Sequence, residues 1–407
     1  MKMRRAGIGA VLLATAIFMS ACGTTAATKD AGSGSESAAK GEVIKVASVT
    51  PLSGSQAALG ESIKNGAQLA LEERVEEFKA MGMDLQFTPQ DDQADPKVGV
   101  TVAQKLIADN DVVAVVGHWN SGVAIPSSEV YKKGNLTMVS PANTAVAVTE
   151  RGLDNVNRIV TRDDAQGPAG ADYCFNELGC KTAFVIQDKT TYGQGVADEF
   201  KKRFEAIGGT SLGYEGITAG ESDFSAVLTK VAATKPDVVY FGGIYPEGSL
   251  IIKQMREKGV EAKFMGPDGM DSGEVLKIAG DSAKGALYTS MAADISGTEE
   301  GKKFNEKYQA KFSKAPEGYA AYGYDAMNVV LSGIASVVKA NGNKKPDKLE
   351  IIKAIRATKD FKGIATTVTF NEKGDNTEAN VYVFQFTDEL KYPPDVIKAI
   401  SAKDYLK

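Results

Sequence analysis

The segment Asp111–Val123, DVVAVVGHWNSGV, shows most directly how this chain folds. Its first seven residues are almost wholly apolar, which is typical of a strand in a parallel sheet that helices cover on both faces. A short loop follows, and Ser121 is expected to begin a helix. In open α/β sheets, ligands bind beyond the carboxyl ends of the strands. The loop after residue 117 is therefore a candidate binding site.

The same alternation of strand and helix continues on both sides of this segment. Helices are expected at 60–80 and 96–108, and further strands at 43–49, 84–88, 136–139, 182–187, 211–215, 237–241, 262–265 and 286–290. Such alternation predicts βαβ units and parallel sheets, so the fold class is α/β. The strands are too many for one doubly wound sheet, and two sheets are expected.

The last 120 residues follow a different pattern. Helices are expected at about 299–313, 319–339 and 346–357, and strands at 363–370 and 380–386. Lys373-Gly374-Asp375 supplies residues that tolerate the positive φ of a reversal between those strands.

The first 21 residues, MKMRRAGIGAVLLATAIFMSA, have the pattern of an export signal. A basic start precedes an apolar run of about 14 residues, too short to span a bilayer. Small residues then lead into Cys22, which resembles a bacterial lipobox; the alternative is an ordinary signal peptide with a chance cysteine. We expect a lipoprotein signal peptide at 1–21, lipidation of Cys22 and a flexible tether at 22–41. The protein would then be exported and anchored by lipid at the outer face of the cytoplasmic membrane, in a periplasm or at the cell surface.

Composition argues against several classes of function. The chain has 407 residues, with 47 basic and 52 acidic side chains, so nucleic acid is not an expected partner. With one His and three Cys in the whole chain, a four-ligand His/Cys metal site is nearly impossible, and no metal or cofactor is expected. G-T-S-L-G at 209–213 has the letters of a hydrolase elbow, but the expected helix precedes it and the strand follows, the reverse of the required order. We expect no enzyme.

The other cysteines and the one histidine each leave two alternatives. Cys174 and Cys180 flank an expected helix end, where they either form a disulfide or stay separate buried thiols. His118 is more often a hydrogen-bonded structural residue than a ligand contact, although it follows the 111–117 strand directly.

Two neighbouring loops after strands offer groups that suit a carboxylate. Ser121 and Thr144 each carry a hydroxyl near free backbone N–H groups, and the helix beginning at Ser121 adds partial positive charge. Simple capping by Ser121 is compatible with this role. Asp268 follows the strand at 262–265 and could pair with a cation, or could be an ordinary turn residue.

Taken together, these loops resemble the type I periplasmic binding proteins for branched-chain amino acids. The resemblance covers about 43–390 and is carried by Val46–Gly54, Asp91–Pro96, Gly117-His118, Ser140–Ala142, Asp188-Lys189, Tyr192–Gly195, Gly216–Gly220, Asp223–Ser225 and Phe264–Pro267. It implies two Rossmann-like doubly wound lobes joined by three crossovers. The implied boundaries are 42–161 with 291–370 for the N-terminal lobe and 162–290 with 371–407 for the C-terminal lobe.

The resemblance also implies the roles of individual residues. The ligand carboxylate would meet Ser121, Thr144 and the Ala142 backbone, with Asn143 beside them. The ammonium would meet the Ala142 carbonyl and Asp268, next to Gly269.

Further residues would enclose the ligand side chain. Tyr192 would belong to the closing face of the second lobe, and Tyr324 would cap the pocket. This chain departs from the family's aromatic pattern at Ile244, with Tyr245 beside it, and at Leu59. Trp119 is a further pocket candidate, or a packed core residue.

The resemblance implies a non-enzymatic receptor that delivers an amino acid, with Leu, Ile or Val expected, to the transmembrane subunits of an ABC permease. The alternative is a receptor or sensor of the same fold for amides or another small amino acid. The protein is expected to act as a monomer.

Overall fold

The structure, a computed structural model, describes residues 41–292 and 294–406. The predicted signal peptide, Cys22 and nearly all of the tether lie outside the described residues. Among the described helices, none is both long enough and apolar enough to cross a bilayer.

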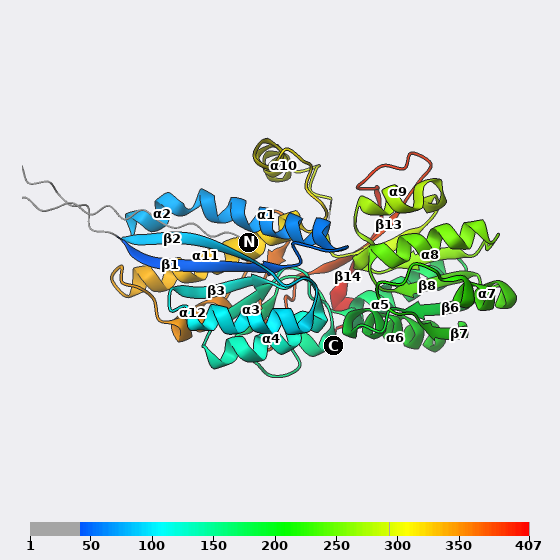
Figure 1. The fold of residues 1–407 in the computed structure, drawn as a ribbon, viewed down its shortest axis with the longest axis horizontal. Coiled ribbons are helices and arrows are strands. Elements are labelled where there is room, and N and C mark those ends of the chain that lie inside the picture. Colours follow the sequence, from blue (N-terminus) through cyan, green and yellow to red (C-terminus); the bar gives the residue numbers. More distant parts are fainter. Residues whose placement is uncertain (1–40, 293, 407) are drawn as a thin grey trace, which may run out of the picture. The chain divides into compact units, whose positions relative to one another are not determined.

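The first sheet has five parallel strands in the order β2-β1-β3-β4-β5, and Figure 1 labels the first three of them side by side. Its strands are β1 (Glu42–Thr50), β2 (Met83–Asp91), β3 (Val112–Gly117), β4 (Thr137–Ser140) and β5 (Val156–Arg158). Successive side chains along a strand point to opposite faces, so each face has its own core. Ile44 and Val46 pack on the side of α1 and α11, and Ala47 and Val49 on the side of α3 and α4.

The helices around this sheet come from two distant parts of the chain. They are α1 (Ala57–Glu73), α2 (Val75–Ala80), α3 (Pro96–Ala108), α4 (Ser121–Lys133), α10 (Glu299–Phe312), α11 (Ala320–Ala340) and α12 (Lys348–Arg356), with the 3-10 turn η1 (Val146–Val148). α11 packs extensively against α1 and also touches β3. Helix α11, at residues 320–340, therefore covers one face of a sheet whose last strand ends at residue 158.

The second sheet has seven strands in the order β14-β13-β10-β9-β8-β6-β7. Its strands are β6 (Thr182–Gln187), β7 (Thr210–Gly216), β8 (Val238–Gly242), β9 (Lys263–Gly266), β10 (Leu287–Ser290), β13 (Asn380–Gln385) and β14 (Val396–Ser401). β6 to β10 pair in parallel, whereas β13 is antiparallel to both β10 and β14.

Helices cover both faces of the second sheet as well. They are α5 (Asp163–Asp172), α6 (Thr191–Ala206), α7 (Ser225–Thr234), α8 (Tyr245–Glu257) and α9 (Glu274–Ala279), with the shorter turns η2 (Tyr173–Glu177), η3 (Asp268–Met270), η4 (Gly280–Ala283) and η5 (Ala402–Asp404). α5 and α6 share a core with Val185 and Tyr240, whereas α7 and α8 pack on the face that carries Ile186 and Phe241.

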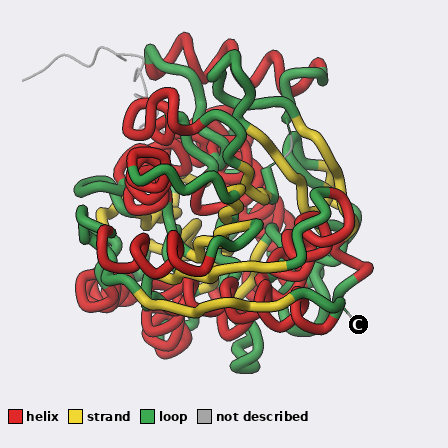
Figure 2. Tube along the Cα trace, turned by 90° about the vertical axis from the view of Figure 1, so that its right-hand side faces the viewer, coloured by secondary structure: helices red, strands yellow, loops and turns green. Residues whose placement is uncertain are grey.

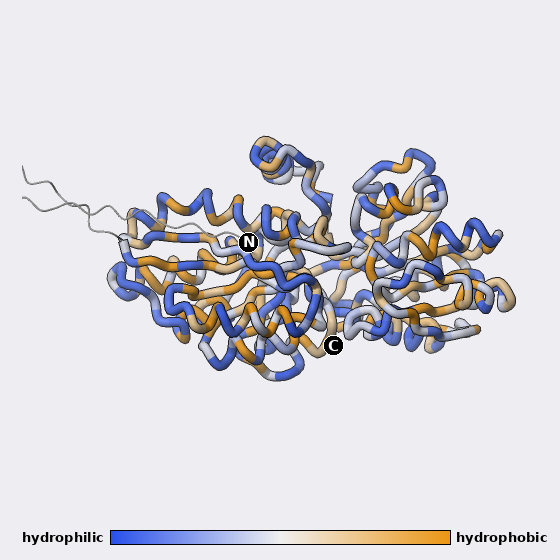
Figure 3. The backbone as a smooth tube through the Cα atoms, in the orientation of Figure 1, coloured by the Kyte–Doolittle hydropathy of each residue, from blue (hydrophilic) through white to orange (hydrophobic). Residues whose placement is uncertain are grey.

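The chain passes between the two sheets three times: after β5, after β10 and before β13. Helices therefore lie around the strands of both sheets, as Figure 2 shows by element type, and the strands carry many of the hydrophobic residues coloured orange in Figure 3. The predicted α/β fold with two doubly wound sheets and three crossovers is confirmed.

Two local predictions need correction, and two strands were not predicted. The single helix expected at 60–80 is divided at Arg74 into α1 and α2. The strand expected at 363–370 is reduced to β12 (Thr367–Val368), which pairs only with β11 (Phe361–Lys362). β5 and β14 were not expected: β5 has three residues, and β14 is a largely exposed strand at the sheet edge.

Candidate ligand-binding site

The loops that follow β3 and β4 are held together by one buried amide. Asn143 Nδ2 donates to the carbonyl of Trp119 at 2.7 Å, and Asn143 Oδ1 accepts from Ser140 Oγ at 2.8 Å. Ser121 Oγ accepts from the backbone N–H of Ala145 at 3.3 Å. Asn143 is thus committed to the loop framework. The cap residue of α4 is Asn120, which makes no side-chain capping bond, and Ser121 is already the first residue of the helix. Ser121 therefore does not cap α4.

Asp268 is the centre of the polar contacts in this region. It lies in η3, directly beyond β9, and is 2% exposed. Its Oδ1 accepts from the hydroxyl of Tyr192 at 2.5 Å, and its Oδ2 from that of Tyr319 at 2.7 Å. The Tyr192 hydroxyl itself accepts from the N–H of Gly269 at 2.9 Å. Because Tyr319 immediately precedes α11 and Tyr192 lies in α6, this carboxylate joins residues from both sheets.

A second buried carboxylate, Asp163, lies within the electrostatic reach of Asp268. Asp163 begins α5, is 1% exposed, and neither of its oxygens has a hydrogen-bond partner among the described residues. Burial, and then the negative charge of Asp268, raise the pKa of Asp163 well above its ordinary value. Burial also raises the pKa of Asp268, against the opposing effect of its tyrosine hydrogen bonds. A cation held between the two would relieve both penalties.

Two uncharged side chains add hydrogen-bonding capacity nearby. Gln166 lies one turn after Asp163; its amide nitrogen donates to Thr289 Oγ1 at 3.1 Å, and its Oε1 has no partner in the described structure. Thr144 is buried, and its hydroxyl has no hydrogen-bond partner among the described residues, although it lies near enough to Asp163 to act against the rise in the pKa of that carboxyl. Buried polar atoms are nearly always paired, so this group of atoms has the character of a ligand site that favours a multiply donating cation.

Apolar side chains complete the surroundings. Trp119 packs its edge against Tyr319, with ring centroids 4.9 Å apart and planes at 74°, and its indole N–H has no partner among the described atoms. The Tyr245 hydroxyl donates to the carbonyl of Ser55, a second contact from the second sheet to the first. One continuous buried cluster contains the predicted apolar members of the site, namely Leu59, Trp119, Ala142, Tyr192, Ile244 and Tyr245.

The structure does not bring Tyr324 to this group. The hydroxyl of Tyr324 donates to Glu73 on α1, and its ring packs edge-on against Phe304 of α10. The expectation that Tyr324 caps the pocket is therefore wrong. α11 begins at Ala320, so residue 324 has turned away along the helix, whereas Tyr319 stands at the helix start and reaches Asp268.

Three residues of the group were not predicted: Asp163, Gln166 and Tyr319. Asp163 and Gln166 follow β5, and because that short strand was not recognised, the loop beyond it was not recognised as a strand-end loop. Tyr319 is one of three tyrosines between 319 and 324, and spacing alone did not distinguish them.

His118 and the two described cysteines have structural environments. His118 is fully buried, with Nδ1 2.7 Å from Asp92 Oδ2 and Nε2 3.0 Å from the Tyr131 hydroxyl. Cys174 and Cys180 are both buried free thiols, so the disulfide alternative is not the one that the structure shows. Burial raises the pKa of both thiols.

The fold consists of two doubly wound sheets joined by three crossovers, and loops of both sheets contribute residues to one buried polar site. These features define a two-lobed solute-binding protein of the type I periplasmic kind. The comparisons agree. A family model described as periplasmic binding protein matches residues 43–390, and the chain belongs to that family.

Relatives and solved structures of this family support the same placement. The chain is 37% identical over 338 residues to a Leu/Ile/Val-binding protein homolog 2 of Brucella abortus, covering 83% of this chain and 88% of that protein. A leucine binding protein LivK from Thermotoga maritima has a TM-score of 0.80 at 28% identity, covering 89% of this chain and 100% of the other. The LivJ protein of Streptococcus pneumoniae in complex with isoleucine has a TM-score of 0.77 at 26% identity, covering 88% and 99%. The chain is a solute-binding protein and not an enzyme.

Proposed function

We propose that this chain is the extracytoplasmic substrate-binding lipoprotein of an ABC importer, and that it binds a branched-chain amino acid between the loops of its two sheets. The observation that carries the proposal is the pair of buried carboxylates, Asp163 and Asp268, beside an apolar wall with Trp119. The isoleucine complex and the Leu/Ile/Val-binding relative support the same ligand class.

In this proposal the two charged ends of an amino acid meet different lobes. The ammonium is held by Asp268 and Asp163, whose oxygens can accept its three hydrogen bonds. The carboxylate is held by Thr144, Ser121 and the amino end of α4, where the macrodipole favours negative charge. Paired in this way, both charges tolerate removal from water.

The apolar wall selects the ligand's side chain. Ile244, Tyr245 and Trp119 offer buried hydrocarbon and aromatic surface. Contact with this surface makes the binding free energy of an aliphatic side chain more favourable by about 25 cal/mol per Å² of apolar area removed from water. An amide lacks the positive charge that two buried carboxylates favour, so a sensor of amides is the less suitable assignment.

Closure of the two lobes around the ligand would produce the form of the protein that docks on the permease. We take the first lobe as 42–161 with 291–370, and the second as 162–290 with 371–407. A ligand that contacts both lobes stabilises the closed form by its differential affinity for that form. The closed protein, tethered through lipidated Cys22, would then dock on the permease.

A thermal-shift screen with the twenty common amino acids tests the proposal. Leucine, isoleucine or valine should raise the melting temperature, because a ligand at a hundred times its Kd stabilises the folded state by about 2.7 kcal/mol. 4-Methylpentanoate and 3-methylbutylamine, which lack the ammonium and the carboxylate of leucine respectively, should give no comparable shift. If none of the amino acids shifts the transition, the proposed ligand class is wrong.

A further inference from the structure

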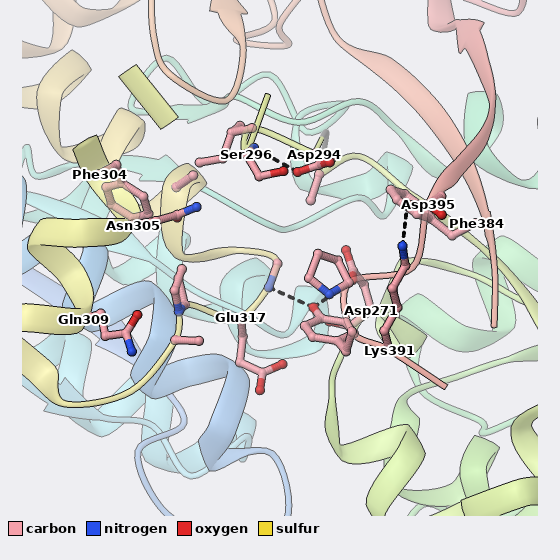
Figure 4. Close-up of a pocket in the computed structure, with 18 residues that line it drawn as sticks. Asp271, Asp294, Ser296, Phe304, Asn305, Gln309, Glu317, Phe384, Lys391 and Asp395 are labelled. Atoms are coloured by element: carbon pink, nitrogen blue, oxygen red, sulfur yellow. Dashed lines mark hydrogen bonds and ion pairs between the residues drawn. The ribbon is translucent and has the colours of Figure 1, made fainter. Parts of the chain in front are cut away.

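Three consecutive residues, Glu317 to Tyr319, lie against the loop Asp268–Gly273 and contact it one after another. We call this pair of segments the clasp. The first segment precedes α11 on the first sheet, and the second follows β9 of the second sheet. Part of the clasp borders a cavity of about 440 Å³, in which Figure 4 shows Asp271 and Glu317.

Glu317 is fixed to the first sheet by its backbone and reaches the second with its side chain. Its N–H donates to Ser62 Oγ on α1 at 3.0 Å. Its carboxylate oxygen Oε2 accepts from Ser272 Oγ at 3.1 Å and from the N–H of Gly273 at 3.0 Å. One residue therefore connects α1, through its backbone, with the loop that carries Asp268, through its side chain.

Gly318 continues the contact by close approach. Its N–H donates to the Tyr392 hydroxyl at 3.0 Å, and that hydroxyl in turn donates to Asp271 Oδ1 at 2.9 Å. A Cβ on Gly318 would lie 2.6 Å from Asp271 Oδ2, so a larger residue would push the Asp271 carboxylate out of this position. Tyr319 then donates to Asp268 at 2.7 Å.

The opposing loop is held firmly from its own side. Asp271 is buried, and its Oδ2 accepts from Ser290 Oγ on β10 at 2.6 Å. The loop therefore presents Asp268 to the ligand site and Ser272 to Glu317 as one unit. In the described part of the chain, Glu317 makes its hydrogen bonds to Ser62, Ser272 and Gly273, and none of these is a residue of the ligand site.

We propose that Glu317 is a positioning residue that holds the closed form together and sets the residence time of the ligand without touching it. This inference rests on the proposed function, since residence time has meaning only for a bound ligand. Contacts that exist only in the closed form slow opening and leave the encounter with the ligand unchanged, so affinity changes through the dissociation rate.

The experiment compares Glu317→Ala with Glu317→Gln and Glu274→Ala in the full chain, using the amino acid found by the screen. Stopped-flow fluorescence of Trp119, the one tryptophan of the sequence, follows binding and release. Glu317→Ala should raise the dissociation rate and the Kd about tenfold, with the association rate within about twofold of wild type. Glu317→Gln keeps an acceptor oxygen and should remain close to wild type.

Glu274→Ala is the matched control, because Glu274 lies beside the clasp but pairs with Lys277, an exposed side chain. The melting temperature of ligand-free Glu317→Ala should equal that of wild type, as expected for a contact of the closed form alone. An unchanged dissociation rate, or a loss of ligand-free stability with no change in rate, would overturn the proposal.

A second measurement separates the clasp from the proposed ligand. Cysteines placed at Glu317 and Ser272 should be joined by a short bismaleimide in the ligand-free protein, because transient closure brings these segments together. Cross-linking in a chain that binds no amino acid would refute the proposed function and keep the clasp. Absence of cross-linking in a chain that does bind one would refute the clasp alone.

Discussion

Removal of the Asp375 carboxylate should destabilise the protein strongly, because it would leave a buried guanidinium without its counter-ion. Asp375 Oδ1 accepts from Arg158 Nε at 2.6 Å and from the Thr149 hydroxyl at 2.8 Å, and Oδ2 accepts from Arg162 Nη1 at 3.2 Å. Arg158 is 0% exposed. Breaking such a buried pair from one side costs about 3–5 kcal/mol, and we expect that loss in the free energy of unfolding for Asp375→Ala.

Urea unfolding followed by circular dichroism measures the loss. The matched control is Asp164→Ala, which removes a partly exposed partner of the same Arg162 at 2.7 Å. Exposed pairs contribute about 1 kcal/mol or less, so the control should lose no more than that. Equal losses in the two variants would refute the argument that burial of Arg158 decides the magnitude.

The same carboxylate predicts a pH dependence with a definite sign. Burial acts to raise the pKa of Asp375, but Arg158, Thr149 and Arg162 together outweigh it and hold the pKa below its ordinary value. The folded state therefore binds the proton less tightly than the unfolded state, and the stabilisation is complete above the unfolded pKa of about 3.9 and is lost as the pH falls through the folded pKa. The difference in the free energy of unfolding between wild type and Asp375→Ala should stay constant between about pH 5 and about pH 7. It should become smaller below about pH 4. A gap that widens on acidification would contradict the assignment.

Four further substitutions test the anchor and the site. Cys22→Ser should move the protein from the membrane pellet to the soluble fraction; persistence in the pellet would refute lipidation. Asp268→Ala should weaken amino-acid binding by about 3–5 kcal/mol in calorimetry, since it leaves the ligand ammonium short of its partner, and an unchanged Kd would refute its role. Asp163→Asn should weaken binding about tenfold or more while Asp164→Asn, next to it but outside the site, does not; equal effects would remove Asp163 from the site. Tyr319→Phe deletes one donor to Asp268 and should cost about 1 kcal/mol of affinity, and a gain in affinity would contradict that hydrogen bond's contribution.

The sequence predicted the fold well where strands are long and buried. β3 and β8 are apolar throughout and were located to within a residue or two, because burial on both faces leaves an unmistakable run. β5 contains Asn157 and Arg158 in three residues, and β14 is mostly exposed, so neither carries such a run. The apolar residues of 363–370 form only a two-residue strand, since their partners are set by tertiary contacts rather than by local pattern.

The residues of the site could likewise be predicted only where they follow a recognisable strand. Ser121, Thr144 and Asp268 could be proposed because each stands just beyond a recognisable strand. Asp163 stands beyond β5 and was missed with it. The choice between Tyr319 and Tyr324 depends on where α11 begins and how it lies on α1, which sequence spacing does not determine.

The three crossovers also set the order in which the second sheet can be completed. β10 has an unpaired outer edge until its antiparallel partner β13 arrives, and β13 follows only after the helices that complete the first sheet. Leu287 pairs with Gln385, about a hundred residues later in the chain, so the loop that must close is long and its closure costs conformational entropy. Until it closes, the second sheet carries an open strand edge, the feature most prone to pairing with a second chain. The second sheet therefore stays vulnerable until nearly the whole chain has reached the compartment where it folds.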